Sequence, residues 1–220
     1  MLVVNSVEKR FGDLEVLKKI SLEIKESEII SIVGSSGAGK TTLLQLLGTL
    51  EKPDSGTITF NGVNPFTLNS KKLAQFRNTE LGFIFQFHQL LPEFTAIENA
   101  ILPALIKGES KSESEQKAKE LFKFLSISHR FEHKPNALSG GEQQRVAVAR
   151  ALINNPKVIF ADEPSGNLDS KNSEELHDLF FKLRDEFGQT FVIVTHNESL
   201  AEMADRKLIM QDGRIINSGV

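Results

Sequence analysis

The sequence predicts an α/β protein with a mainly parallel sheet and a helical insertion. Short apolar strand patterns alternate with helical patterns in the first and last thirds of the chain. A glycine-rich segment at 34–41 separates one strand pattern from the helical pattern that follows it. Residues 94–155 are mostly helical in periodicity, so they interrupt the alternation as an inserted subdomain.

The elements of the first third are expected to be short strands separated by turns. The strand patterns cover residues 22–24, 29–33, 57–60 and 81–85. Turn signals flank the third of these strands at 53–56 and 61–62. A helix is expected to begin after the glycine-rich segment, at Thr42, and to stop near Gly48.

The rest of the chain divides into the helical insertion and a return to alternation. Ser112 and Glu115 have the spacing of a capping box and predict the start of a helix. Strand patterns follow at 158–161 and 190–195, separated by a helical face that ends at Gly188. The Asp212-Gly213 pair predicts a hairpin that ends the chain.

Length and composition restrict the class of protein. The 220 residues are enough for one large domain, or for one domain with a subdomain. The net charge of −3 argues against a nucleic-acid partner, and the chain contains no cysteine for disulfides or metal ligation. No apolar run approaches the roughly 18 residues of a membrane span. We therefore expect any membrane role to come through partners.

The glycine-rich segment fits the phosphate loop G-x-x-x-x-G-K-[ST]. Its residues are Gly34, Ser35, Ser36, Gly37, Ala38, Gly39, Lys40 and Thr41, with Thr42 next in the helix. Such a loop directs backbone N–H groups at a polyphosphate. We expect an exposed Lys40 to reach the β- and γ-phosphates and the Thr41 hydroxyl to ligate Mg²⁺. The alternative is a glycine-rich turn that matches by chance.

Two adjacent carboxylates follow the apolar strand pattern at 158–161. Asp162 and Glu163 lie at the carboxyl end of that strand, where open α/β sheets place their sites. We expect Asp162 to hold Mg²⁺ and Glu163 to orient or deprotonate an attacking water. The alternative is a solvated loop start.

The segment Leu138-Ser139-Gly140-Gly141-Glu142-Gln143-Gln144-Arg145 allows two interpretations. Ser139 and Glu142 have capping-box spacing, so the segment could simply begin a helix. That interpretation does not require two consecutive glycines, which weaken a helix by about 1 kcal/mol each. Glycines at a helix N-terminus would instead let a phosphate approach the backbone.

This L-S-G-G-E-Q-Q-R segment resembles the signature of ABC-type ATPases. The other motifs of that family follow in its order, with Gln86 in the Q-loop position, 167–169 in the D-loop position and His196 as the switch histidine. The resemblance implies a RecA-like P-loop core, an N-terminal antiparallel β portion and an inserted helical subdomain. The core would comprise roughly 1–86 and 157–220, and the helical subdomain with the signature 87–156.

Further roles follow from the resemblance. Phe11 corresponds to the aromatic residue that stacks on adenine, or is an ordinary core phenylalanine. Gln86 would ligate Mg²⁺ or the attacking water, and His196 would contact the γ-phosphate. Ser139 and Gly141 would bind the ATP held by a second subunit, so the chain would form a homodimer upon ATP binding. Asp169 either contributes to that site or caps the helix after it.

The segments 81–99 and 163–169 narrow the resemblance to the ATPases of lipoprotein-releasing transporters. Such a protein would power the release of lipoproteins while attached to the cytoplasmic face of the inner membrane. Two integral membrane permease subunits would dock near residues 87–94, from Phe87 to Phe94, unless this apolar stretch is only a folded loop. The alternatives are an export ATPase for macrolides or peptides and a cell-division ATPase that transmits force without transport.

Overall fold

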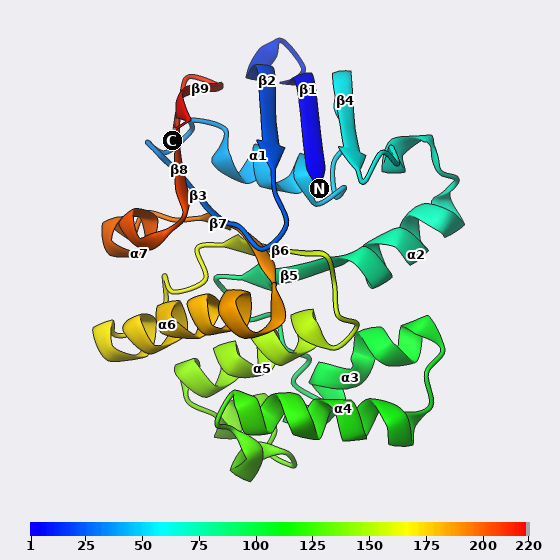
Figure 1. Cartoon of the computed structure of the whole chain (residues 1–220). Coiled ribbons are helices and arrows are strands. Elements are labelled where there is room, and N and C mark those ends of the chain that lie inside the picture. The colour runs from blue at the N-terminus through cyan, green and yellow to red at the C-terminus, as the bar shows by residue number, and fades with distance from the viewer. Residues whose placement is uncertain (219–220) are drawn as a thin grey trace.

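The computed structural model describes residues 1–218, which form two sheets and a group of helices (Figure 1). The smaller sheet is antiparallel and has the strand order β2-β1-β4. Its strands are β1 (Leu2–Phe11), β2 (Leu14–Ile24) and β4 (Ser55–Phe60). It stands at the top of Figure 1, at the opposite end from the inserted helices.

The larger sheet has six strands in the order β5-β6-β7-β3-β8-β9. The strands are β3 (Ile29–Gly34), β5 (Leu81–Phe85), β6 (Val158–Asp162), β7 (Thr190–Val194), β8 (Arg206–Gln211) and β9 (Arg214–Ser218). Neighbouring strands are parallel except β8 and β9, which form the predicted hairpin. The carboxyl ends of β3, β5, β6 and β7 therefore meet at one edge of the sheet.

Seven helices surround these sheets in the part of the chain that the structure describes. They are α1 (Lys40–Leu47), α2 (Ser70–Glu80), α3 (Ala96–Lys107), α4 (Lys111–Phe124), α5 (Gly140–Leu152), α6 (Ser170–Phe187) and α7 (Glu198–Met203). Helices α3, α4 and α5 lie together below the larger sheet in Figure 1, as expected for the helical subdomain predicted from the sequence. None of the described helices is both long and apolar enough to cross a membrane.

Two apolar clusters cover opposite faces of the larger sheet. Ile30 and Ile32 of β3 face the cluster shared with α1 and the smaller sheet. Ile29 of the same strand faces the second cluster, together with Ile159 of β6 and residues of α3, α5 and α6. Because the parallel strands are buried on both faces, their sequences are almost continuously apolar. The predicted α/β fold is confirmed.

Some elements differ from the expectation. Strands β1 and β2 span 10 and 11 residues, whereas the sequence pattern indicated only a short strand at 22–24. Ser6 and Lys19 have positive φ angles in these strands, and their pairing contains register shifts that break the apolar alternation. Helix α2 was not anticipated because none of its residues is buried, which leaves no apolar face to recognise.

The cap of α4 is also displaced from its predicted position. Ser110 and Glu113, not Ser112 and Glu115, form the capping box. Gly108 ends α3 in the left-handed conformation, so the next helix can already begin at Lys111. The sequence contains two overlapping S-x-x-E patterns, at 110–113 and 112–115. The first one forms the cap because α3 ends just before it.

Candidate functional site

The phosphate loop joins β3 to α1 with its glycines in conformations that favour them. Gly39, the N-cap residue of α1, has a φ of 99° and supplies no side-chain cap. A Cβ at Gly39 would lie 2.9 Å from Leu17 Cδ2, so a larger residue would collide with β2. The N-terminal N–H groups of α1 therefore remain available to an anion.

Lys40 is folded back over this loop. Its Nζ donates hydrogen bonds to the carbonyl oxygens of Gly34 and Ser35, at 2.9 and 3.0 Å. The residue is only 7% exposed, so the expectation of an exposed lysine was wrong. Lys40 can be buried because these two hydrogen bonds satisfy its ammonium group inside the curve of the loop.

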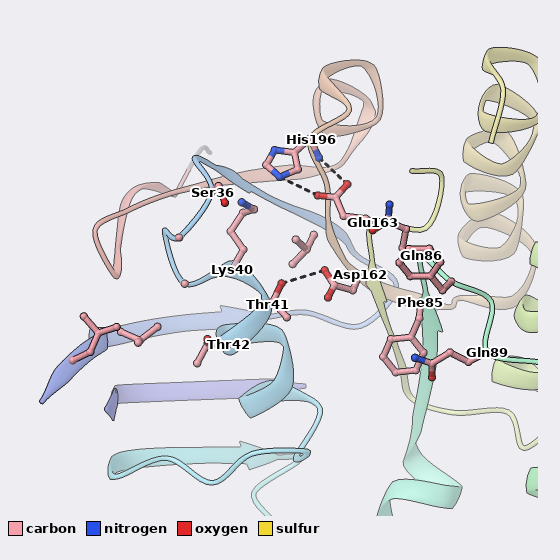
Figure 2. A pocket seen from close by; sticks show the side chains of 16 residues that line it. Ser36, Lys40, Thr41, Thr42, Phe85, Gln86, Gln89, Asp162, Glu163 and His196 are labelled. Atoms are coloured by element: carbon pink, nitrogen blue, oxygen red, sulfur yellow. Dashed lines mark hydrogen bonds and ion pairs between the residues drawn. The ribbon is translucent and has the colours of Figure 1, made fainter. Parts of the chain in front are cut away.

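Thr41 and Asp162 meet across the cavity from α1 and the end of β6 (Figure 2). The Thr41 hydroxyl donates to Asp162 Oδ1 at 3.5 Å. Burial raises the pKa of Asp162, and the Thr41 hydroxyl and Lys40 ammonium offset that effect only in part. A hydroxyl beside a carboxylate that lacks full charge compensation fits a small hard cation such as Mg²⁺.

Glu163 is held by its backbone and by His196. Its φ of 48° is left-handed, and its N–H donates to the Val194 carbonyl at the end of β7, at 2.9 Å. The His196 N–H donates to Glu163 Oε2 at 3.1 Å, and the His196 ring Nε2 lies 3.4 Å from Oε1 (Figure 2). Oε1 is buried and accepts no hydrogen bond. The carboxylate is thus oriented into the cavity with unused acceptor capacity.

Gln86 is linked to the loop that follows β6. Its side-chain Nε2 donates to Asn167 Oδ1 at 3.1 Å, and Asn167 Nδ2 donates to the Gln86 carbonyl at 3.0 Å. These reciprocal bonds join the ends of the neighbouring strands β5 and β6.

Most of the predicted phosphate-loop and catalytic residues line one open cavity of about 570 Å³, whereas Gly34, Ser35 and Ala38 of the loop do not. Those that line it are Ser36, Gly37, Gly39, Lys40, Thr41, Thr42, Gln86, Asp162, Glu163 and His196. The volume lies in the range of small-molecule and cofactor sites. Among the described residues, no group of three or more histidine, aspartate or glutamate side chains could hold a metal ion by itself. A cation held by Asp162 and Thr41 would need further ligands from a bound polyphosphate or water.

Phe11 does not line this cavity. It ends β1 with half of its surface exposed, and Lys9 Nζ lies 5.1 Å from its ring centroid. Leu14 and Val16, on the adjacent strand β2, line the cavity instead. Neither residue was predicted from the sequence, although apolar residues just after the Phe11-Gly12 turn were a usable signal. The adenine contact of Phe11 stays a prediction.

Ser139, Gly141 and Asp169 lie apart from the cavity, at the N-termini of α5 and α6. Ser139 N–H donates to Glu142 Oε2 at 2.8 Å and Glu142 N–H donates to Ser139 Oγ at 3.3 Å, which completes the predicted capping box. Although burial opposes ionisation, the Ser139 N–H and the Arg130 guanidinium lower the pKa of Glu142 to about 2. Asp169 caps α6 by accepting from the Asn172 N–H at 2.9 Å.

The two helix N-termini touch at Gly141. A Cβ on Gly141 would lie 2.6 Å from Asn172 Oδ1, so only glycine allows this approach. The side chain of Asn172 is held in place because its Nδ2 donates to Asp169 Oδ2 at 2.6 Å. The structural interpretation therefore explains one of the two glycines, whereas Gly140 has only Leu168 Cδ2 nearby, at 3.6 Å.

Comparison with known proteins places this arrangement in a family. The family model described as "ABC transporter" matches residues 17–166. A curated protein of Bacteroides fragilis, "Lipoprotein-releasing system ATP-binding protein LolD", is 59% identical over 98% of this chain and 100% of its own length. The protein of the same name from Cytophaga hutchinsonii is 57% identical over 98% of this chain and 99% of its own length.

A solved structure has the same fold. It is a dimeric ATP-binding cassette in a post-hydrolysis state bound to ADP and Pi, with a TM-score of 0.90 and 39% identity. The match covers 100% of this chain and 98% of that one.

Proposed function

Because this chain belongs to the ABC transporter family, and is therefore a nucleotide-binding ATPase, we propose that it powers the release of lipoproteins from the inner membrane. The observation that carries the proposal is similarity over nearly the whole chain to proteins named for the lipoprotein-releasing system. The same relatives favour this role over export of macrolides or peptides and over force transmission in cell division.

We propose that the cavity binds ATP with Mg²⁺. The phosphate loop and the N-terminus of α1 would hold the phosphates, with Lys40 leaving the carbonyls of its own loop to contact the β- and γ-phosphates. Thr41 and Asp162 would hold the cation, with Gln86 as a further ligand, and the cation would neutralise charge on the phosphates. Phe11, with Leu14 and Val16, would contact the adenine.

Glu163 is the proposed general base for the attacking water. Glu163 lines the cavity, and its Oε1 accepts no hydrogen bond from the protein. His196 holds this carboxylate through its backbone N–H and would contact the γ-phosphate with its ring. Gln86 would position the water from the opposite wall.

The site is proposed to be completed by a second copy of the chain. Ser139, Gly141 and Asp169 lie outside the cavity, at helix N-termini that favour negative charge. A head-to-tail homodimer formed with ATP would bring them to the partner's nucleotide. The dimeric state of a similar cassette supports this arrangement.

The membrane partners are proposed to be two permease subunits that dock on residues 87–94. Leu91 and Phe94 are 42% and 37% exposed, whereas Phe87, which is 71% exposed, also lines the cavity. The segment is nevertheless held firmly, because Arg150 donates to the carbonyls of His88 and Gln89, at 2.7 Å each. Leu90 instead packs against the core, which makes it unsuitable as a probe of docking. This docking would place the chain peripherally at the cytoplasmic face of the inner membrane.

Reconstitution tests the proposed function. The chain is combined with the membrane subunits encoded beside its gene, in proteoliposomes that contain a lipoprotein, and ATP-dependent release to a soluble carrier is measured. We expect release with the wild type and loss of both release and co-purification with Leu91→Ser/Phe94→Ser, two exposed positions that do not line the cavity. Val63→Ser, at an exposed apolar residue just after β4 of the smaller sheet, is the matched control. ATP hydrolysis without any lipoprotein release by the wild type would contradict the proposal.

A further inference from the structure

Two buried polar side chains outside the cavity hold the loop that follows Glu163. Gln144 of α5 is fully buried, and its Nε2 donates to the Pro164 carbonyl at 2.7 Å. Its Oε1 is buried as well and has no hydrogen-bond partner. A buried amide costs free energy when it is incompletely paired, so packing alone does not favour glutamine at this position.

His177 of α6 makes the second contact. It is 3% exposed, and its Nε2 lies 3.0 Å from the hydroxyl of Ser165, which is also buried. Burial lowers the pKa of His177, against the opposing effect of Asp178 and Glu174. The ring is therefore neutral at pH 7, and one of its nitrogens carries the proton.

The two contacts fall on consecutive residues, directly after Glu163. On the other side, the Glu163 N–H is bonded to the carbonyl of Val194 in β7. The left-handed Glu163 is thus fixed between the sheet and two helices, α5 and α6. The Gly166 N–H also donates to the Glu163 carbonyl at 3.0 Å, so the contacts at Pro164 and Ser165 add to the bonds that hold this sparsely populated conformation.

We infer that His177, acting through Ser165, is a positioning residue for hydrolysis, and that Gln144 supports it through Pro164. Neither side chain lines the cavity, so neither touches the nucleotide. Their effect is on where the Glu163 carboxylate lies, and proton transfer depends steeply on that geometry. This inference rests on the proposed role of Glu163.

The test is the steady-state hydrolysis of ATP by the full chain and a set of variants. His177→Phe keeps a ring but removes the hydrogen bond between residues 177 and 165. Ser165→Ala removes the same bond by deleting the hydroxyl. We expect each to lower kcat about fivefold, the size of effect of one lost neutral hydrogen bond. The KM for ATP should stay within about twofold, because the phosphate loop is unchanged.

Two further variants separate positioning from general damage. The double variant should be no slower than either single one, since both remove the same contact. His177→Gln should restore most of the activity, because its terminal amide can take the place of the ring Nε2 and hydrogen-bond the Ser165 hydroxyl as donor or as acceptor. Ser114→Ala, at a buried serine of α4 whose hydroxyl donates to the Ser110 carbonyl at 2.8 Å, is the matched control for Ser165→Ala and should leave kcat unchanged.

A His177→Phe variant with wild-type kcat, or single effects that multiply in the double variant, would overturn the inference. If His177→Phe does not fold, the kcat of Ser165→Ala alone tests the inference, and a wild-type value would overturn it. Glu163→Gln is measured alongside. If it remains active, the proposed role of Glu163 fails and the inference with it, whereas an inactive Glu163→Gln beside an unaffected Ser165→Ala rejects the inference only.

Discussion

Gly140 and Gly141 provide a matched pair of substitutions at one helix N-terminus. Both are helical, so alanine at either would improve helix propensity by up to about 1 kcal/mol. At Gly140 the new Cβ finds its nearest neighbour at 3.6 Å, an ordinary contact. At Gly141 it lies 2.6 Å from Asn172 Oδ1 and 3.0 Å from Asn172 Cγ. An added methyl in filled space costs about 1–3 kcal/mol, so the steric effect outweighs propensity there.

We therefore expect Gly140→Ala to leave stability equal or higher and Gly141→Ala to lower it by about 1 kcal/mol. A domain of this size shifts its Tm by about 2–4 °C per kcal/mol. Thermal unfolding without nucleotide should separate the two variants by at least that amount. Asn172→Ala removes the obstructing atoms. In a chain that carries Asn172→Ala, adding Gly141→Ala should therefore no longer lower the Tm. Equal Tm values for both alanine variants would refute the reasoning.

Four other outcomes are expected. Glu163→Gln should lower kcat by about 10²–10⁴-fold and leave an ATP-bound dimer on size-exclusion chromatography; a monomer that binds ATP would argue against the assignment. Lys40→Ala should abolish nucleotide binding, measured by calorimetry, and wild-type turnover would reject its role. A mixture of inactive Ser139→Arg and Lys40→Ala chains should regain partial hydrolysis if sites assemble across the dimer; no recovery with proven heterodimers would exclude this. Burial lowers the pKa values of His177 and His88, so the unfolded state binds more protons below about pH 6.5 and the unfolding free energy should fall as the pH drops. Urea unfolding at about pH 7.5 and about pH 5.5 checks this, and His177→Phe should flatten the dependence.

The parallel strands and the cavity residues could be predicted because each leaves a strong local pattern. β3 and β6 are buried on both faces, so their apolar runs were visible, and the phosphate loop has a fixed spacing. Helix α2 buries none of its residues and left no such pattern. A single histidine in a helix does not reveal its partner either. The contact between His177 and Ser165 depends on how α6 packs against the loop after β6, which only the folded structure provides.

The attachment of residues 87–94 has a mechanical consequence. Arg150 holds the carbonyls at one end of the segment, and Asn99, which is fully buried, bonds the backbone of Leu91 and Phe94 at the other. A segment anchored in this way resists deformation, and in the proposed docking it would transmit a displacement at Gln86 to the bound subunits. A flexible segment in the same place would deform instead, and the free energy of ATP hydrolysis would be lost as heat without moving a partner. In the proposed docking, the stiffness of this short connection would limit how much of the free energy of each hydrolysis event reaches the permease subunits.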